Sequence, residues 1–298
     1  MFRYVVVGIS TLFLAACLPT NDCPQCQKPI PKPLDTRKQI KIGASEINMP
    51  PYLIATDHTG LEQEIIERSF ELAGYKAVFE YTNNRKQQYA NKDELHCITT
   101  VIEPSGVGDI YGVKSYFSDP IVPYQDVAIY LENPHFKIQT INDLKGKKVE
   151  AFKRADKILG FQHLNLDSSS YREHSSKASQ ILMLYHQTVD VLLMDVLMFD
   201  FYYRKMESKL HEIERKKREE LANKTPPESF SGYKIKVTPL FSPQPYQIAC
   251  KDQQLLTHFN AGLKLVKQPN QGNLSEYEQM LKKSDYQLKT PYELVLPN

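Results

Sequence analysis

The sequence lacks tryptophan, a marked excess of either charge and any long apolar run beyond its N-terminus. Without tryptophan, an aromatic wall around a ligand has to be built from tyrosine or phenylalanine, and the chain has 18 tyrosines. The 37 Lys and Arg residues almost balance the 35 Asp and Glu residues, which leaves a net charge of +2. This balance argues against nucleic acid as a partner, because tracking phosphates requires a concentrated basic surface.

The short motifs of several large enzyme classes are also absent. The sequence contains no HExxH zinc motif, no GxSxG nucleophile motif and no GxxxxGKS/T phosphate loop. Glu62 and Glu64 are two positions apart, so on a helix they do not face each other. We interpret them as acidic residues that interact favourably with the positive end of the helix dipole. We therefore expect no catalytic residue, no metal and no cofactor.

The N-terminus is the one stretch apolar enough to enter a membrane. Arg3 precedes an apolar run, Tyr4–Leu14, which has the length of a signal-peptide core and is shorter than the roughly 20 residues of a spanning helix. The run ends in Leu14-Ala15-Ala16-Cys17, which resembles a bacterial lipobox. This predicts a lipoprotein signal peptide over residues 1–16 and lipidation of Cys17, against the alternative of an ordinary signal peptide with an incidental cysteine.

The predicted anchor implies an extracytoplasmic protein that is held on the membrane through its lipid. In a Gram-negative host the outer membrane is favoured, because Leu18 rather than Asp follows the cysteine. Residues 17–37 are predicted to form a tether, with prolines at positions 19, 24, 29, 31 and 33 that favour extended backbone. Cys23 and Cys26 lie in this tether without further zinc ligands, so a local disulfide or an inert pair is the favoured interpretation.

From Lys38 onward the apolar residues alternate between strand and helix periods. Lys38–Ala44 alternates polar and apolar residues as a half-buried strand does, and a helical stripe follows Gly60 and ends at Gly74. Later, Ser176–Gln187 has helical spacing and precedes an apolar strand that ends at Asp195. This alternation predicts an α/β fold. A charged run over 204–220 is expected to be a solvent-facing helix or insertion.

The order of these segments resembles the bacterial extracellular solute-binding proteins of family 3, the polar amino-acid type. Tyr116–Pro120 matches the family's "FSxP" segment, and Asp190–Asp195 matches its "D-apolar-apolar-x-x-D" strand. The other matching segments are Lys41–Ala44 with Pro50–Tyr52, Gly60–Ile65, Asp143–Val149 and Tyr246–Lys251. Each match is short, and the resemblance depends on their order along residues 40–285.

The resemblance implies the periplasmic-binding-protein type II fold, an α/β architecture of two lobes with two hinge crossings. Residues 38–125 and 255–298 are assigned to lobe 1, and residues 126–254 to lobe 2, with a charged helical insertion at about 204–226. The implied function is capture of a small polar solute, amino-acid-like or other, in the cleft between the lobes. The implied partners are that solute and a membrane permease for ABC-type uptake, and we expect the protein to be a monomer.

The resemblance also places candidate ligand contacts, each with a simpler alternative. Glu46 is expected to contact the ligand or to be a solvated loop carboxylate, and Asp195 to pair with a ligand ammonium or to cap the helix before Met198. Tyr52 and Tyr81 are expected to form walls of the cleft or to pack in the core. Thr99 and Thr100 are expected to contact a ligand carboxylate or to lie on the sheet surface. The last two candidates, Phe152 and Arg154, follow a strand of the second lobe.

Two departures from the family pattern put a standard amino-acid ligand in doubt. The family's arginine upstream of "FSxP" is missing, because Ser105–Val113 contains none. The family's glycine–threonine turn after the second-lobe strand is replaced by Phe152, Lys153 and Arg154. A cation at this turn is expected to take over an anionic ligand group, or Arg154 faces water.

Two other functions stay open at this point. One is a cyclohexadienyl-dehydratase-like enzyme on the same fold, for which Glu46, His96 and Asp195 are the only suitable acid or base groups. The other is an orphan lipoprotein of envelope sensing or assembly that contacts a partner through residues 204–220. The sequence also leaves open whether Cys97 and Cys250 are buried thiols or form a bridge.

Overall fold

The computed structural model describes most of the chain from Lys38 onward, namely residues 38–91, 94–102, 106–133, 137–222, 232–269, 273–283 and 293–294. These residues belong to one unit, Arg37–Asn298. The predicted signal peptide, Cys17 and the tether with Cys23 and Cys26 lie outside the described residues. None of the described helices combines the length and the hydrophobicity of a membrane-spanning segment.

The first sheet has the strand order β2-β1-β3-β12-β5-β4, and β6 also pairs with β12. β1 runs parallel to β2 and β3, whereas β12 runs antiparallel to β3, β5 and β6. The strands are β1 (Lys38–Ala44), β2 (Tyr75–Tyr81), β3 (Cys97–Val101), β4 (Val107–Ile110), β5 (Val113–Phe117), β6 (Val122–Tyr124) and β12 (Gln244–Cys250). This mixed sheet forms the first lobe.

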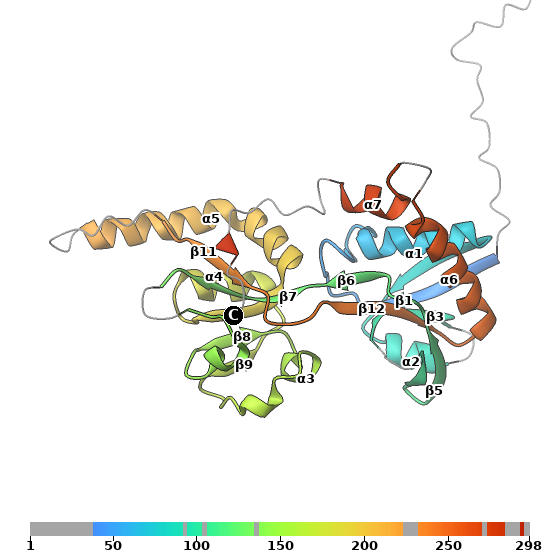
Figure 1. The fold of residues 1–298 in the computed structure, drawn as a ribbon, viewed down its shortest axis with the longest axis horizontal. Helices are drawn as coiled ribbons and strands as arrows, with labels where there is room; N and C mark the ends of the chain where they lie inside the picture. The colour runs from blue at the N-terminus through green and yellow to red at the C-terminus, as the bar shows by residue number, and fades with distance from the viewer. Residues whose placement is uncertain are drawn as a thin grey trace, which may run out of the picture. The chain divides into compact units, whose positions relative to one another are not determined.

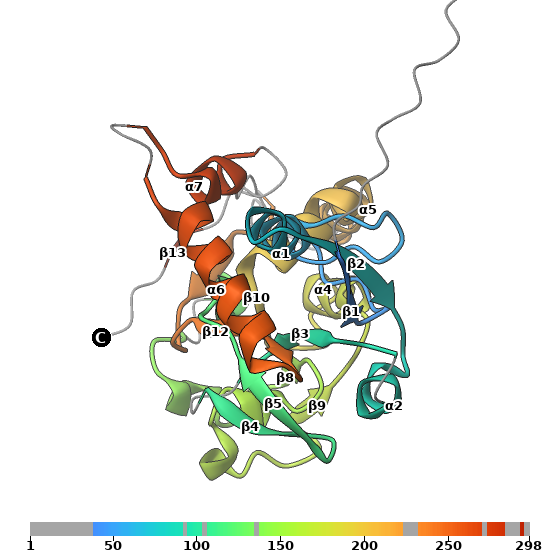
Figure 2. The ribbon, with the colours of Figure 1, turned by 90° about the vertical axis from the view of Figure 1, so that its right-hand side faces the viewer.

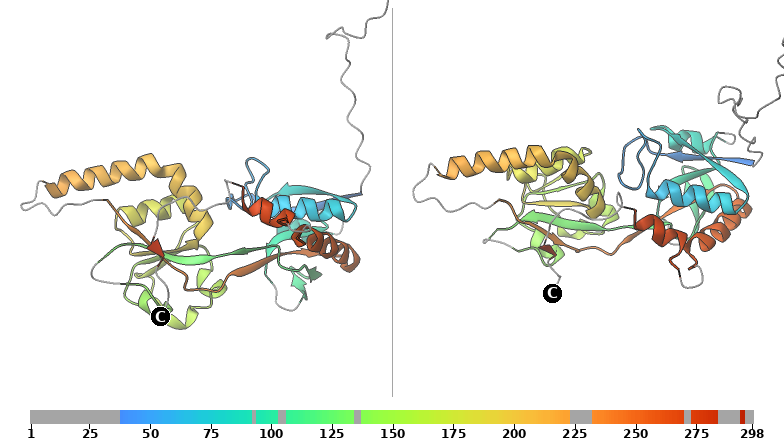
Figure 3. Two further views of the ribbon diagram at one scale, coloured as in Figure 1. Left: turned by 45° about the horizontal axis from the view of Figure 1, so that its top comes forward. Right: turned by 90° about the horizontal axis from the view of Figure 1, so that it is seen from above.

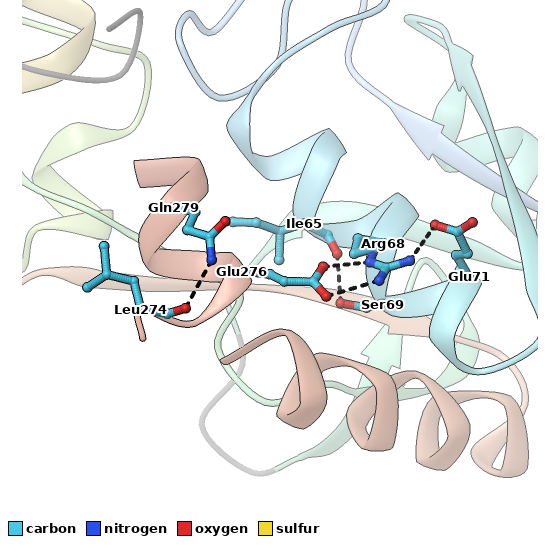
Figure 4. A network of polar contacts seen from close by, with 7 residues as sticks. All are labelled: Ile65, Arg68, Ser69, Glu71, Leu274, Glu276 and Gln279. Carbon is cyan, nitrogen blue, oxygen red and sulfur yellow. Dashed lines mark hydrogen bonds and ion pairs between the residues drawn. The ribbon is translucent and has the colours of Figure 1, made fainter. Parts of the chain in front are cut away.

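Helices α1 (Leu61–Leu72) and α6 (Gln253–Lys267) lie side by side on the first lobe, next to α7 (Glu276–Leu281) (Figure 2). α1 and α6 approach closely at Gly262, where an added Cβ would lie 2.0 Å from the Ser69 carbonyl oxygen. Arg68 of α1 joins α7 through a two-point ion pair with Glu276, with nitrogen–oxygen distances of 2.6 and 3.0 Å (Figure 4). A further short helix, α2 (Arg85–Ala90), precedes β3.

The second sheet has the strand order β13-β11-β7-β10-β8-β9. Its strands are β7 (Asp126–Leu131), β8 (Val149–Ala151), β9 (Tyr171–Glu173), β10 (Val191–Asp195), β11 (Ile235–Thr238) and β13 (Glu293–Leu294). The helical segments are α3 (Ala155–Ile158), α4 (Lys177–Tyr185), α5 (Val196–Ala222) and the two 3-10 turns η1 (Ile141–Leu144) and η2 (Gln162–Leu164). β7, β8 and β10 are buried along their whole length, and apart from Asp126, Glu150 and Asp195 they consist of apolar and aromatic residues.

Two connections join the sheets (Figure 1). The chain passes from β6 to β7 through Gln125, and it returns between β11 and β12. At the crossings β6 and β12 pair antiparallel, with Tyr124 opposite Gln244. This arrangement confirms the predicted α/β fold of two lobes with two crossings.

Two strands, β12 and β13, pair in the sheet of the other lobe from the one to which their residue ranges were assigned. β12 lies within 126–254, which was assigned to lobe 2, but it pairs only in the first sheet. β13 lies within 255–298, which was assigned to lobe 1, but it pairs with β11 in the second sheet. An apolar pattern predicts that a strand exists, whereas its sheet depends on the partner strand that it meets.

The charged run is not a separate insertion but the continuation of α5, which has 27 residues. Both views in Figure 3 show α5 extending past the strands of the second sheet. Its apolar stripe packs inward, with Leu210 fully buried, while its charged residues pair with each other, as Arg215 does with Glu212 and Glu219. Of the expected span 204–226, residues 223–226 lie outside the described residues.

Cys97 and Cys250 form a disulfide. They are directly opposite each other on the antiparallel pair β3 and β12, and both are fully buried. The bond joins positions 153 residues apart, so it fixes the returning crossing strand to the first sheet. The sequence left open whether these residues are thiols or a bridge, and the structure contains the bridge.

Candidate functional site

A cavity of about 240 Å³ lies between the two lobes. Residues 47–49 line it from the first lobe, and Phe152, His174 and Lys177 line it from the second. Tyr124 and Tyr246, which belong to the crossing strands β6 and β12, form its aromatic wall. Because the cavity is lined by both lobes, it is where the sequence resemblance places a ligand.

Asp195 lies at the floor of this cavity, where β10 ends and α5 begins. Its Oδ1 accepts hydrogen bonds from the backbone N–H groups of Leu197 and Met198, both at 3.0 Å, which is helix N-cap geometry. Its Oδ2 accepts from the Tyr52 hydroxyl at 3.0 Å and from the Gln125 N–H at 2.7 Å. Burial raises the pKa of Asp195 to about 6, although these hydrogen bonds oppose the rise.

Tyr52 and Tyr124 connect this aspartate to a second buried carboxylate. Their rings stack with centroids 3.7 Å apart, and Tyr124 also packs against Tyr246 at 4.2 Å. The Tyr52 hydroxyl donates to Asp195, whereas the Tyr124 hydroxyl donates to Glu62 at 2.7 Å. Burial, then the nearby acids, raises the pKa of both tyrosines, so the hydroxyls stay protonated donors.

Glu62 is fully buried in the first turn of α1. Besides Tyr124, it accepts hydrogen bonds from the Thr99 hydroxyl and from the N–H and hydroxyl of Thr100, the latter two at 3.1 and 3.2 Å. Gly60 lets α1 begin here, because a Cβ at this position would lie 2.2 Å from the Tyr52 carbonyl oxygen. Burial raises the pKa of Glu62, and the hydrogen bonds act in the opposite direction.

Two residues that the sequence suggested as ligand contacts, Thr99 and Thr100, bind Glu62 instead of facing the cavity. Thr99 and Thr100 turn their hydroxyls to Glu62, and neither lines the cavity. Thr100 has a φ of 59°, a left-handed conformation that is unusual for a β-branched residue and is held by the bond from its N–H to Glu62. Glu62 was interpreted from the sequence as answering the helix dipole, and its network of donors could not be seen there.

Three other candidates lie away from the cavity lining. Glu46 is exposed and pairs with Asn83, and Tyr81 donates to Gln63 at 2.5 Å. Arg154 is exposed in a left-handed conformation, with φ 63°, at the residue before α3. Of the predicted contacts, the cavity therefore gathers Asp195 and Phe152, while Tyr52 lies buried behind Asp195.

The cavity also contains two charged residues that the sequence reasoning missed. Asp126 begins β7 directly opposite Asp195 on β10, and it is 4% exposed. Burial, then the charge of Asp195, raises the pKa of Asp126 to about 7, with Lys177 acting against the rise. Burial lowers the pKa of Lys177 to about 8, and both aspartates oppose this. The only sequence signal was an acid directly before a buried strand and a lysine after the cap Ser176.

Lys177 is positioned by the start of α4 and by an aromatic ring. Ser176 caps α4 by accepting a hydrogen bond from the Ser179 N–H at 3.3 Å, which fixes the first turn. The Lys177 ammonium lies 5.4 Å from the centre of the Phe152 ring, a cation–π distance. The cavity thus combines two carboxylates, the ammonium groups of Lys153 and Lys177 and aromatic faces, which suits a small polar ligand with apolar parts.

No model of a protein family and no curated protein matches the sequence. Among solved structures, a mutant of the arginine-binding protein ArgBP from T. maritima is 16% identical with a TM-score of 0.53, over 82% of this chain and 93% of that chain. The arginine-, lysine-, histidine-binding protein ArtJ from Geobacillus stearothermophilus is 16% identical with a TM-score of 0.54, over 82% and 94%.

A third similar structure is a histidine kinase sensor domain with similarity to periplasmic binding proteins. It is 14% identical with a TM-score of 0.54, over 83% of this chain and 95% of that chain. At these identities the likeness concerns the fold. The chain has the two-lobed type II fold of the periplasmic binding proteins.

Proposed function

We propose that this protein captures a small polar solute in the cavity between its lobes, and that closure of the lobes secures the solute. The observation that carries the proposal is the cavity itself, which both lobes line and which holds Asp126, Lys177 and a tyrosine wall. Contacts that form only when the lobes meet on a solute would favour the closed state over the open one.

The size and lining of the cavity support a small solute. Its volume of about 240 Å³ is below the range of roughly 300–1,000 Å³ that is usual for drug-sized ligands. Tyr124 and Tyr246 offer flat apolar faces, and the charged groups offer orientation. The similar structures include proteins named as arginine-binding, which supports an amino-acid-like solute as the first class to test.

We propose that the lipid anchor predicted from the sequence holds this protein outside the cytoplasm. A protein tethered by acyl chains on Cys17 would hold the solute near a membrane permease, and ABC-type uptake is the process that we propose it serves. Loss of membrane association in a Cys17→Ser variant, measured by fractionation, would support this part of the proposal.

The contacts of the acid and base groups favour binding over the dehydratase-like alternative. Glu46 is exposed beside Asn83, and His96 accepts a hydrogen bond from the Lys41 N–H at 3.0 Å on the strand pair β1 and β3. Asp195 has both oxygens occupied by donors. These three groups do not converge on one point of the cavity, so an acid–base pair of the expected kind is not assembled.

A thermal-shift screen tests the proposed function on the chain from Thr20 onward. The compounds are amino acids, amines, organic acids and short oligopeptides, with prephenate and arogenate assayed for turnover. A solute at 100 times its dissociation constant adds about 2.7 kcal/mol of stability, which raises the melting temperature by roughly 5 °C or more. Binding without product formation is the expected result, and turnover of prephenate or arogenate would favour the enzyme.

A further inference from the structure

We propose that Asp126 receives a positively charged nitrogen of the solute and that Asp195 is a positioning residue behind it. This inference rests on the proposed function and names the chemical class of the solute as one that carries a protonated amine or guanidinium group. The two aspartates lie opposite each other on β7 and β10, and both line the cavity. They differ in how their oxygens are used.

The Asp195 carboxylate has little capacity left for a ligand. Its oxygens accept two backbone N–H groups from the start of α5, one from Gln125 at the crossing and one hydroxyl from Tyr52. A carboxylate has about four lone-pair sites, and four donors occupy them. A ligand nitrogen that approached Asp195 would displace a donor and leave a buried N–H or hydroxyl unpaired, which is unfavourable.

The Asp126 carboxylate has its hydrogen-bonding capacity free. Although the residue is 96% buried, with 4% of its surface exposed, no group among the described residues donates a hydrogen bond to its side chain. A buried carboxylate that accepts no hydrogen bond is unfavourable for folding, and such groups concentrate at binding and catalytic sites. Because Asp126 lines the cavity, a bound solute can donate a hydrogen bond to it.

The charges that face Asp126 are of both signs. Asp195 on β10 adds a second negative charge, and Lys177 on α4 supplies the opposing one. Lys177 lies over the Phe152 ring, and no ion pair within 4 Å joins it to either aspartate in the described part of the chain. Lys153 and His174 also line the cavity. The lining therefore carries two carboxylates and two ammonium groups, and Asp126 is the carboxylate whose oxygens accept no hydrogen bond within the described part of the chain.

The aromatic wall suits a positively charged group. Tyr124 and Tyr246 line the same cavity, and their rings pack together with centroids 4.2 Å apart. The face of a tyrosine ring attracts a cation, and the attraction grows when water is excluded. A protonated nitrogen beside Asp126 would gain from both the carboxylate and these rings once the lobes close.

Matched test compounds and isosteric variants test the assignment by isothermal titration calorimetry. The compounds are L-arginine, L-lysine, agmatine and cadaverine, the diacetylated forms of lysine and cadaverine, which carry no protonated nitrogen, and the amine-free acids succinate and 2-oxoglutarate. We expect that binding compounds carry a protonated nitrogen and that acetylating it abolishes binding. Asp126→Asn should weaken binding about 10- to 100-fold, since a charge-assisted hydrogen bond is lost.

Lys177→Met is the matched control because it removes the opposing charge from the same cavity. It should tighten the binding of agmatine or cadaverine, which have no carboxylate, since repulsion of their nitrogen is removed. A loss of binding in Lys177→Met with unchanged binding in Asp126→Asn would overturn the assignment. So would a solute without a protonated nitrogen that binds the native protein and Asp126→Asn equally.

Two results separate this inference from other failures. If none of the compounds and no solute of the wider screen binds the native protein, the proposed function falls, and the inference falls with it. If solutes bind and Asp126→Asn has no effect on them, the proposed function stands and the Asp126 assignment is wrong. Ligand-free Asp126→Asn should melt at the native temperature or above it, and a lower melting temperature would indicate a structural role instead.

Discussion

Two buried carboxylates, one in each lobe, are used in opposite ways. Glu62 in the first lobe is fully buried and accepts hydrogen bonds from Thr99, Thr100 and Tyr124. Asp126, at the entry to the second lobe, is nearly as buried and has no hydrogen-bond donor among the described side chains and backbone groups. A buried carboxylate whose oxygens all accept hydrogen bonds stabilises the fold. A buried carboxylate without donors keeps oxygens that can accept hydrogen bonds from a ligand in the cavity.

Asp195 belongs with Glu62 in this comparison, although it shares the cavity with Asp126. The stacked rings of Tyr52 and Tyr124 link the two satisfied carboxylates, because each hydroxyl donates to a different one. This chain of contacts passes from α1 in the first lobe to the start of α5 in the second. The satisfied groups therefore form a polar network across the lobes, and Asp126 lies beside it.

The largest expected effect on stability comes from removing the Glu62 carboxylate. Glu62→Ala leaves the Thr99, Thr100 and Tyr124 donors without their acceptor in a buried place, which should lower the free energy of unfolding by about 3–5 kcal/mol. Urea denaturation measures the change. Glu64→Ala is the control on the same helix, and its part-exposed ion pair with Lys283 should contribute less than about 1 kcal/mol. Equal effects of the two variants would contradict the comparison.

The disulfide should matter nearly as much, because it fixes the strand that carries the two threonines. Thr99 and Thr100 follow Cys97 on β3, and Cys250 holds β12 against it. Replacing both cysteines by alanine should lower the free energy of unfolding by about 2–4 kcal/mol. Melting temperatures with and without reductant measure this. The native protein should lose stability in reductant, and the double variant should not respond to it.

The unsatisfied carboxylate predicts a pH dependence of stability. The folded pKa of Asp126 is about 7, above its ordinary value of 3.8, so the folded state binds more protons than the unfolded state between these values. Stability should therefore fall as the pH rises from about 4 to about 7, by an amount on the order of 2 kcal/mol. Asp195, with a pKa of about 6, acts in the same direction, and Lys177 is protonated throughout this range.

Asp126→Asn removes this contribution, so its stability should fall less over the same pH range. Chemical denaturation at pH 4, 5, 6 and 7 compares the two proteins. At pH 7 the variant should be the more stable of the two, because it lacks the buried unpaired charge. Parallel curves for the variant and the native protein would show that Asp126 is not the group that titrates.

The fold could be predicted from the sequence because its signals are local. The alternation at Lys38–Ala44 and the helical stripe after Gly60 predicted β1 and α1, whereas the two lobes with two crossings were implied by the family resemblance. The lobe boundaries could not be placed as well, because β12 and β13 pair with strands that are distant in the sequence. Strand pairing over such separations depends on tertiary contacts.

The site was harder to predict, because a residue's role there depends on its neighbours in space. Asp195 was recognised as either a ligand contact or a helix cap, and only its distances to Leu197 and Met198 reveal the cap geometry. Thr99 and Thr100 meet a glutamate 37 and 38 positions away, which no local pattern shows. Asp126 looked like any acid before a strand until its register opposite Asp195 was known.

The smallest expected effect concerns Arg154, which was a candidate contact by its position after β8. It is exposed, and its φ of 63° is a left-handed conformation that is unfavourable for most residues other than glycine and asparagine. Arg154→Gly should therefore raise the free energy of unfolding by about 0.5–1 kcal/mol, whereas Arg154→Ala keeps the backbone strain and should change it little.

Since the guanidinium lies outside the cavity lining, both variants should bind any solute of the native protein with unchanged affinity. Weaker binding in both variants would bring Arg154 into the site and would mean that the cavity of Asp126 extends farther when the lobes close.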